Sequence, residues 1–125
     1  MNAALTAYQQ NSVETSSPGR LVVMLYEGLL TALDKVEAAL DSGPRDIELA
    51  HHELTRGQAI ITELLSSLNP AAGQITESLA QLYEYCHHQL VQANITKDFG
   101  PAQPVRSIFT DLKEAWELIV NGVVT

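Results

Sequence analysis

The spacing of helix-breaking residues constrains this chain of 125 residues more than any other feature. The breaks pair a capping or turn residue with Pro or Gly, and they fall at Ser16-Ser17-Pro18, Ser42-Gly43-Pro44, Asn69-Pro70 with Gly73, and Phe99-Gly100-Pro101. The segments that follow are about 20 to 25 residues long and rich in Leu, Ala, Glu and Gln. This division predicts four helices joined by short loops.

Apolar or small residues recur three and four positions apart within these segments, which is the spacing of one helix face. From Arg45 to Leu68 the series is Ile47, Ala50, Leu54, Gly57, Ile61, Leu64 and Leu68. The next segment gives Ile75, Leu79, Leu82, Cys86, Leu90 and Ala93, and the last gives Val105, Ile108, Leu112, Ala115 and Ile119. Each series predicts a bundle seam, and short connections favour antiparallel neighbours. We therefore expect an all-α fold, with an antiparallel up-and-down four-helix bundle over residues 18–125. A cap segment over residues 1–17, with a short extra helix near Asn2 to Gln10, completes one domain.

The segment from Pro18 to Leu40 carries more apolar surface than one seam requires. One stripe contains Leu21, Leu25, Gly28, Ala32, Val36 and Ala39. A second contains Val22, Tyr26, Leu29, Leu33 and Leu40. At 100° per residue the two stripes together cover roughly 160° of arc. Either this helix lies at the centre of the bundle, or the second stripe is a groove that receives another helix.

Composition narrows the classes of function. The chain is 46% hydrophobic and 18% charged, which is typical of a globular protein. A formal net charge of −8 and the absence of a basic run disfavour nucleic acid and anionic membranes as partners. No apolar stretch is long enough for membrane insertion. The lone Cys86 and an N-terminus without signal-peptide features predict a cytosolic protein.

Two Glu-x-x-His pairs, Glu48 with His51 and Glu84 with His87, have the spacing used by di-iron bundles. On ideal helices, however, Glu48 lies about 150° and Glu84 about 165° from the centre of its own seam. Both carboxylates should therefore face water, and we expect neither a metal nor any other cofactor.

Other catalytic arrangements are equally weak. Adjacent histidines, such as His87 and His88, diverge by about 100° on a helix and cannot serve one phosphotransfer site. Cys86 lies on an apolar seam, where a thiolate is disfavoured. The sequence lacks a Gly-rich phosphate loop and a nucleophile elbow. We therefore expect no catalytic residues and no enzymatic activity.

Three stretches of the sequence resemble the flagellar secretion chaperone FliS family. The first is Ala7 to Pro18, AYQQNSVETSSP, followed by Arg20-Leu21-Val22-Val23-Met24-Leu25-Tyr26-Glu27-Gly28. The second is Leu82-Tyr83-Glu84-Tyr85 with Leu90 and Ala93-Asn94, and the third is Glu114-Ala115-Trp116. Two departures are visible, because Gly19 stands where the family often has His and Gln89 where a basic residue is common. The resemblance covers nearly the whole chain.

The resemblance implies a cytoplasmic export chaperone. Such a protein would bind the C-terminal helical segment of flagellin, prevent premature polymerisation and deliver it to the flagellar type III export apparatus, where a component of the export gate is a second partner. It also favours the groove interpretation, with the client-binding residues Tyr8, Asn11, Val13, Val22, Tyr26, Leu29 and Leu33. The alternative is a helical adaptor or structural module that self-associates, for example as a homodimer, and has no flagellin client.

Overall fold

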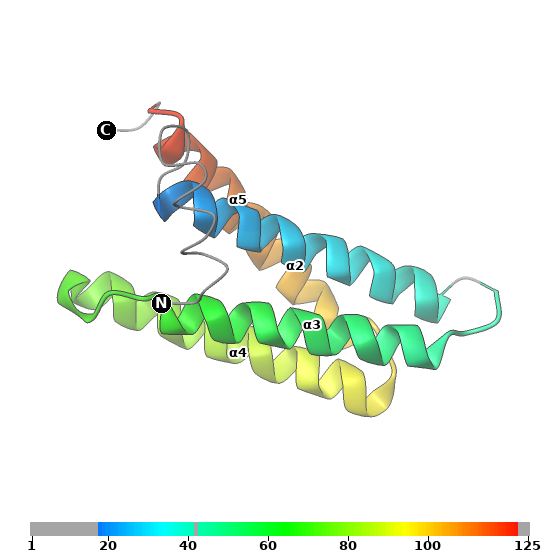
Figure 1. Ribbon diagram of the computed structural model, residues 1–125. Coiled ribbons are helices and arrows are strands. Elements are labelled where there is room, and N and C mark those ends of the chain that lie inside the picture. Colours follow the sequence, from blue (N-terminus) through cyan, green and yellow to red (C-terminus); the bar gives the residue numbers. More distant parts are fainter. Residues whose placement is uncertain (1–17, 42, 123–125) are drawn as a thin grey trace.

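Four α-helices form an all-α bundle in the computed structural model, which describes residues 18–41 and 43–122 (Figure 1). They are α2 (Pro18–Asp41), α3 (Ile47–Ser66), α4 (Gln74–Thr96) and α5 (Gln103–Val120). Two 3-10 turns connect them, η1 (Pro70–Ala72) before α4 and η2 (Gly100–Ala102) before α5. The predicted fold class is confirmed. The helix expected near Asn2 to Gln10 lies outside the described residues.

The helix boundaries follow the chemistry of the predicted breaks. Helix α2 begins at Pro18, where a missing N–H is tolerated. Helix α3 begins at Ile47, two residues after the expected Arg45, because the Asp46 side chain accepts a hydrogen bond from the Leu49 N–H. Lys97 ends α4 in the left-handed conformation, with φ of 51°. Within the described ranges, no helix combines the length and apolar character of a membrane span.

Helix α2 is the central helix of the bundle. It packs along both α3 and α5. The side chains that it buries come from both predicted stripes and from Val23: Leu21, Val23, Tyr26, Leu29, Ala32, Leu33, Val36, Ala39 and Leu40. Two neighbouring helices therefore explain the wide apolar arc of this segment.

Helices α4 and α5 approach each other mainly at one end of the bundle. There, η2 packs on the C-terminal half of α4, and Gln89 Nε2 donates a hydrogen bond to the Pro101 carbonyl at 3.2 Å. Towards the other end, α5 follows α2. A Cβ on Gly19 would lie 2.9 Å from Val120 Cγ2 and 3.6 Å from the Trp116 ring, so glycine permits this close approach. The N-terminal half of α4 is therefore left without a cover from α5.

Three helices meet closely at Gly57 of α3. A Cβ at this position would lie 3.1 Å from Leu29 Cδ1 of α2 and 3.1 Å from Leu90 Cδ1 of α4. Both leucines are fully buried. Gly57 thus brings the backbone of α3 against two neighbours at once, in the middle of the core.

A larger side chain at Gly57 should overpack this contact. We expect Gly57→Val to lower the free energy of unfolding by about 1 to 3 kcal/mol. At Gly28 a Cβ would meet only Ile60 Cδ1, at an ordinary 3.5 Å. The control Gly28→Ala should therefore raise stability by about 0.5 to 1 kcal/mol through helix propensity. Urea unfolding followed by circular dichroism measures both, and a Gly57→Val variant as stable as the parent would contradict the close packing.

Candidate binding pocket

An apolar pocket of about 590 Å³ lies where α5 diverges from the start of α4. This is the left end of the bundle in Figure 1, where α2 begins and α5 ends. Residues from α2, α4, α5, η1 and the turn that follows α3 line it: Pro18, Gly19, Val22, Ser67, Leu68, Asn69, Ala72, Ile75, Thr76, Leu79, Tyr83, Leu112, Ala115, Trp116 and Ile119. The volume is sufficient for a few large apolar side chains but not for a whole helix.

The pocket walls are the outer ends of predicted seams. Ile75 is 63% exposed although it continues the series that ends in the buried Leu90 and Ala93. Ile119 is 53% exposed although it continues the series that begins with the buried Val105. These seams are covered by the bundle over only part of their length. The surplus apolar surface therefore lies on α4 and α5, and sequence reasoning did not assign it to a binding site.

The expected groove on α2 is only partly open. Val22 is half-buried and lines the pocket. Tyr26, Leu29 and Leu33, which we expected to meet a client, are fully buried in the core. The expectation of an open stripe through these three residues is wrong, because α3 and α5 cover both sides of α2. Tyr8, Asn11 and Val13 lie outside the described residues.

One member of a hydrogen-bonded pair of tyrosines lines the pocket. The Tyr26 and Tyr83 hydroxyl oxygens are 2.6 Å apart in a hydrogen bond between α2 and α4. Phe109 of α5 makes an edge contact with the Tyr26 ring, at 5.3 Å between centroids, and stacks on the Tyr83 ring at 5.9 Å. Tyr83 lines the pocket, so this pair closes its inner end with one polar contact in apolar surroundings.

The local environment keeps these groups neutral. Burial, and next the hydrogen bond with Tyr83, raises the pKa of Tyr26 far above its ordinary value of 10.0, while a hydrogen bond from the Trp116 side chain acts in the opposite direction. Burial also raises the pKa of Tyr83. Burial raises the pKa of the Cys86 thiol to about 12, so a nucleophilic thiolate is disfavoured there.

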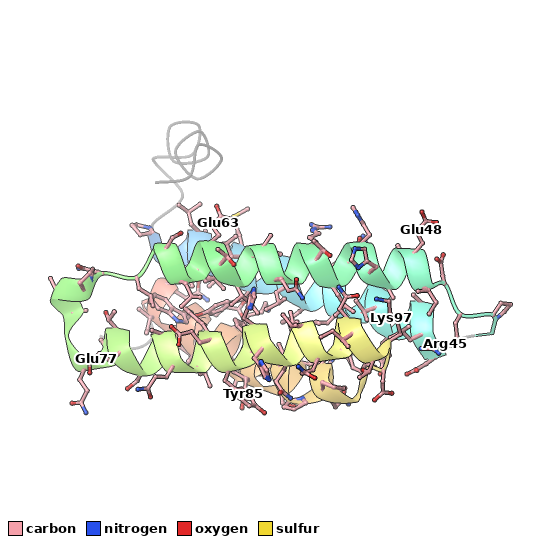
Figure 2. All side chains as sticks on the ribbon, turned by 90° about the horizontal axis from the view of Figure 1, so that it is seen from below. Arg45, Glu48, Glu63, Glu77, Tyr85 and Lys97 are labelled. Carbon is pink, nitrogen blue, oxygen red and sulfur yellow. The ribbon has the colours of Figure 1, made fainter. Side chains whose placement is uncertain are left out.

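The side chains considered for metal binding or phosphotransfer lie away from the pocket. Glu48 and Glu84 are both exposed, as their angular positions predict. Figure 2 shows Glu48 and Glu77 pointing outwards from α3 and α4. His51 Nδ1 is 3.1 Å from Asn94 Oδ1, a contact between the outer faces of those two helices. Within the described residues, no three His, Cys, Asp or Glu side chains are grouped closely enough to hold a metal ion.

The fold and this site define a helical bundle with an apolar pocket at one end. A family model for the flagellar protein FliS matches residues 1–123. The Bacillus subtilis flagellar secretion chaperone FliS is 39% identical over 117 residues, which are 94% of this chain and 86% of that protein. The Salmonella typhimurium protein of the same name is 31% identical over 94% of this chain and 90% of its own. The Campylobacter jejuni one is 31% identical over 97% and 94%. The chain belongs to the FliS family of flagellar proteins.

The burial of the second stripe can be tested by truncation. Leu33 is fully buried, whereas Leu25 is only partly buried at the edge of the core. We expect Leu33→Ala to cost about 2 to 5 kcal/mol of unfolding free energy, because a buried cavity is left behind. The same truncation at Leu25 removes less buried surface and should cost less. Urea unfolding of the two variants measures both losses. If the Leu33→Ala variant were as stable as the parent, the interpretation of the second stripe as an open groove would be correct after all.

Proposed function

We propose that this protein is a cytosolic export chaperone that binds the C-terminal helical segment of flagellin. Binding prevents premature polymerisation and delivers the client to the flagellar type III export apparatus. The mechanism is occupancy of an apolar surface, without catalysis, nucleotide or cofactor. Membership of the FliS family and the printed name of its relatives, flagellar secretion chaperone, support this role. The observation that carries the proposal is the open apolar pocket of about 590 Å³.

The pocket suits the anchoring of an amphipathic helix. Its walls present Ile75, Leu79, Leu112 and Ile119, and Val22 contributes from α2. A client that folds as it binds loses conformational entropy, which must be offset by apolar burial. Side chains spaced three and four apart on one face of a client helix could enter such a pocket together. We therefore propose these wall residues and Val22 as client contacts.

The segment before α2 is the second part of the proposed site. Pro18, the first residue that the structure describes, lines the pocket. On the family resemblance, we propose that Tyr8, Asn11 and Val13 contact the client. A component of the export gate remains the proposed second partner, without assigned residues. With 15 acidic against 7 basic residues, we propose no nucleic-acid partner.

The pocket assignment predicts which exposed apolar residues matter. Replacing Ile75 and Ile119 together with Gln should weaken binding of a flagellin C-terminal peptide by about 100-fold or more, because two apolar contacts worth about 1.5 kcal/mol or more each are lost. Isothermal titration with flagellin from the same bacterium measures this affinity. Both residues are already exposed in the free protein, so stability should change little.

The matched control replaces Ile95 and Leu49, which are 71% and 40% exposed and do not line this pocket. Their double replacement with Gln should leave peptide affinity unchanged. Equal weakening by both double variants would place the client elsewhere. If the parent binds no flagellin peptide and light scattering finds only self-association, the proposed chaperone function is wrong and the adaptor alternative stands.

Deletion of residues 1–12 tests the proposed role of the N-terminal segment. We expect the remaining chain to keep its helicity and melting temperature, because the described core is built from residues 21–109. Peptide affinity should change, since Tyr8 and Asn11 are removed. Circular dichroism and titration measure the two properties separately. A deletion that melts the bundle would instead assign the segment to the core.

A further inference from the structure

The hydroxyl groups at the rim of the pocket already have hydrogen-bond acceptors. Ser67 Oγ donates to the Leu64 carbonyl at 2.8 Å, and Thr76 Oγ1 donates to the Asn69 carbonyl at 2.5 Å. Their protons are therefore used to complete the turn between α3 and α4. Tyr83 differs, because its hydroxyl is bonded to the hydroxyl of another tyrosine, Tyr26.

A proton count on the tyrosine pair leaves one O–H uncommitted. Two hydroxyls carry two protons, and the hydrogen bond between Tyr26 and Tyr83 uses one of them. Neither hydroxyl has another hydrogen-bond acceptor among the described residues. A buried donor without an acceptor costs free energy.

The pocket determines which tyrosine offers the spare proton. Tyr83 lines the pocket although it is only 2% exposed, whereas Tyr26, at 0%, does not line it. In the arrangement that leaves neither proton without a possible acceptor, the Tyr26 O–H donates to the Tyr83 oxygen. The Tyr83 O–H then points towards the pocket. Apolar residues, including Val22, Leu79 and Leu112, make up most of the remaining wall. A client that enters the pocket could thus complete the hydrogen bonds of the pair.

We infer that Tyr83 is a specificity-determining residue, which donates a hydrogen bond to a neutral acceptor on the client as the apolar side chains enter the pocket. This inference rests on the proposed function. The acceptor is the oxygen of an Asn, Gln, Ser or Thr side chain, or a backbone carbonyl at the end of the client helix. A carboxylate is disfavoured, because the pocket is apolar and the chain carries a net charge of −8. The pair therefore selects a segment that combines apolar anchors with one neutral acceptor.

Conservative variants separate the two tyrosines. Tyr83→Phe removes the donor and leaves the client acceptor unpaired, so the affinity for the flagellin C-terminal peptide should fall about 5- to 100-fold. Tyr26→Phe keeps the Tyr83 donor, so it should weaken peptide binding much less than Tyr83→Phe does. Tyr85→Phe, at a position 46% exposed and outside the pocket, is the surface control and should bind as the parent does. Urea melts on all three variants correct for any loss of folded protein.

Client variants identify the source of the acceptor. Each Asn, Gln, Ser and Thr of the peptide is replaced by Ala in turn and titrated against the parent protein and the Tyr83→Phe variant. For a side-chain acceptor, one replacement weakens binding to the parent but not to Tyr83→Phe, as a double-mutant cycle requires. If every replacement leaves the Tyr83→Phe effect in place, the acceptor is a backbone carbonyl.

A spectroscopic measurement tests the same contact without removing the hydroxyl. With Tyr83 replaced by 3-fluorotyrosine, the fluorine resonance should shift on saturation with the parent peptide, and the acceptor-deficient peptide should reduce that shift. Binding by Tyr83→Phe equal to the parent, or equal losses in Tyr83→Phe and Tyr26→Phe, would overturn the inference while leaving the chaperone proposal intact. Failure of the parent to bind the peptide would overturn both.

Discussion

The close approach of three helices at Gly57 is the contact on which the rest of the bundle depends. Because this residue has no side chain, Leu29 of α2 and Leu90 of α4 can both reach the backbone of α3. The contact fixes α2, α3 and α4 relative to one another around the fully buried core. Helix α5 does not take part in this contact and packs mainly on α2. It can therefore diverge from α4 at one end, and this divergence opens the pocket.

Helix spacing predicted the fold well because the pattern of apolar residues and the position of breaks are local properties. The extent to which neighbours cover a seam is a tertiary property. Ile75 and Leu90 belong to the same series on α4, yet one is 63% exposed and the other fully buried. Nothing in their spacing distinguishes them. The direction taken by α5, which depends on packing at Gly19, decides which end of the seam is left open.

The same limit explains the wrong expectation for the second stripe of α2. A wide apolar arc fits both a central helix and a helix with an open groove, and the family resemblance favoured the groove. Tyr26 and Leu33 are buried because α2 has two neighbours along its length. Glu53 shows the converse case, a carboxylate only 5% exposed that the apolar series of α3 does not include. Its contacts with His52 and Arg56, each 3.8 Å, are longer than hydrogen bonds.

The two ends of the bundle are held by different interactions, and this difference locates the site. At one end, Arg106 lies 3.1 Å from Asp34, 3.0 Å from Glu37 and 4.7 Å from the centroid of the Phe99 ring, which ties α5 to α2 and to the end of α4. At that end Arg45 also donates to the Lys97 carbonyl, and Figure 2 shows both residues there. At the pocket end, Arg20 donates a hydrogen bond to Asn121 Oδ1 at 3.3 Å. This bond joins α2 to the end of α5 and does not involve α4. The polar contacts described above between α5 and the end of α4 therefore lie at the end opposite the pocket. Apolar side chains of the proposed client that enter the pocket at the other end would contact the exposed parts of both seams without breaking any of these contacts.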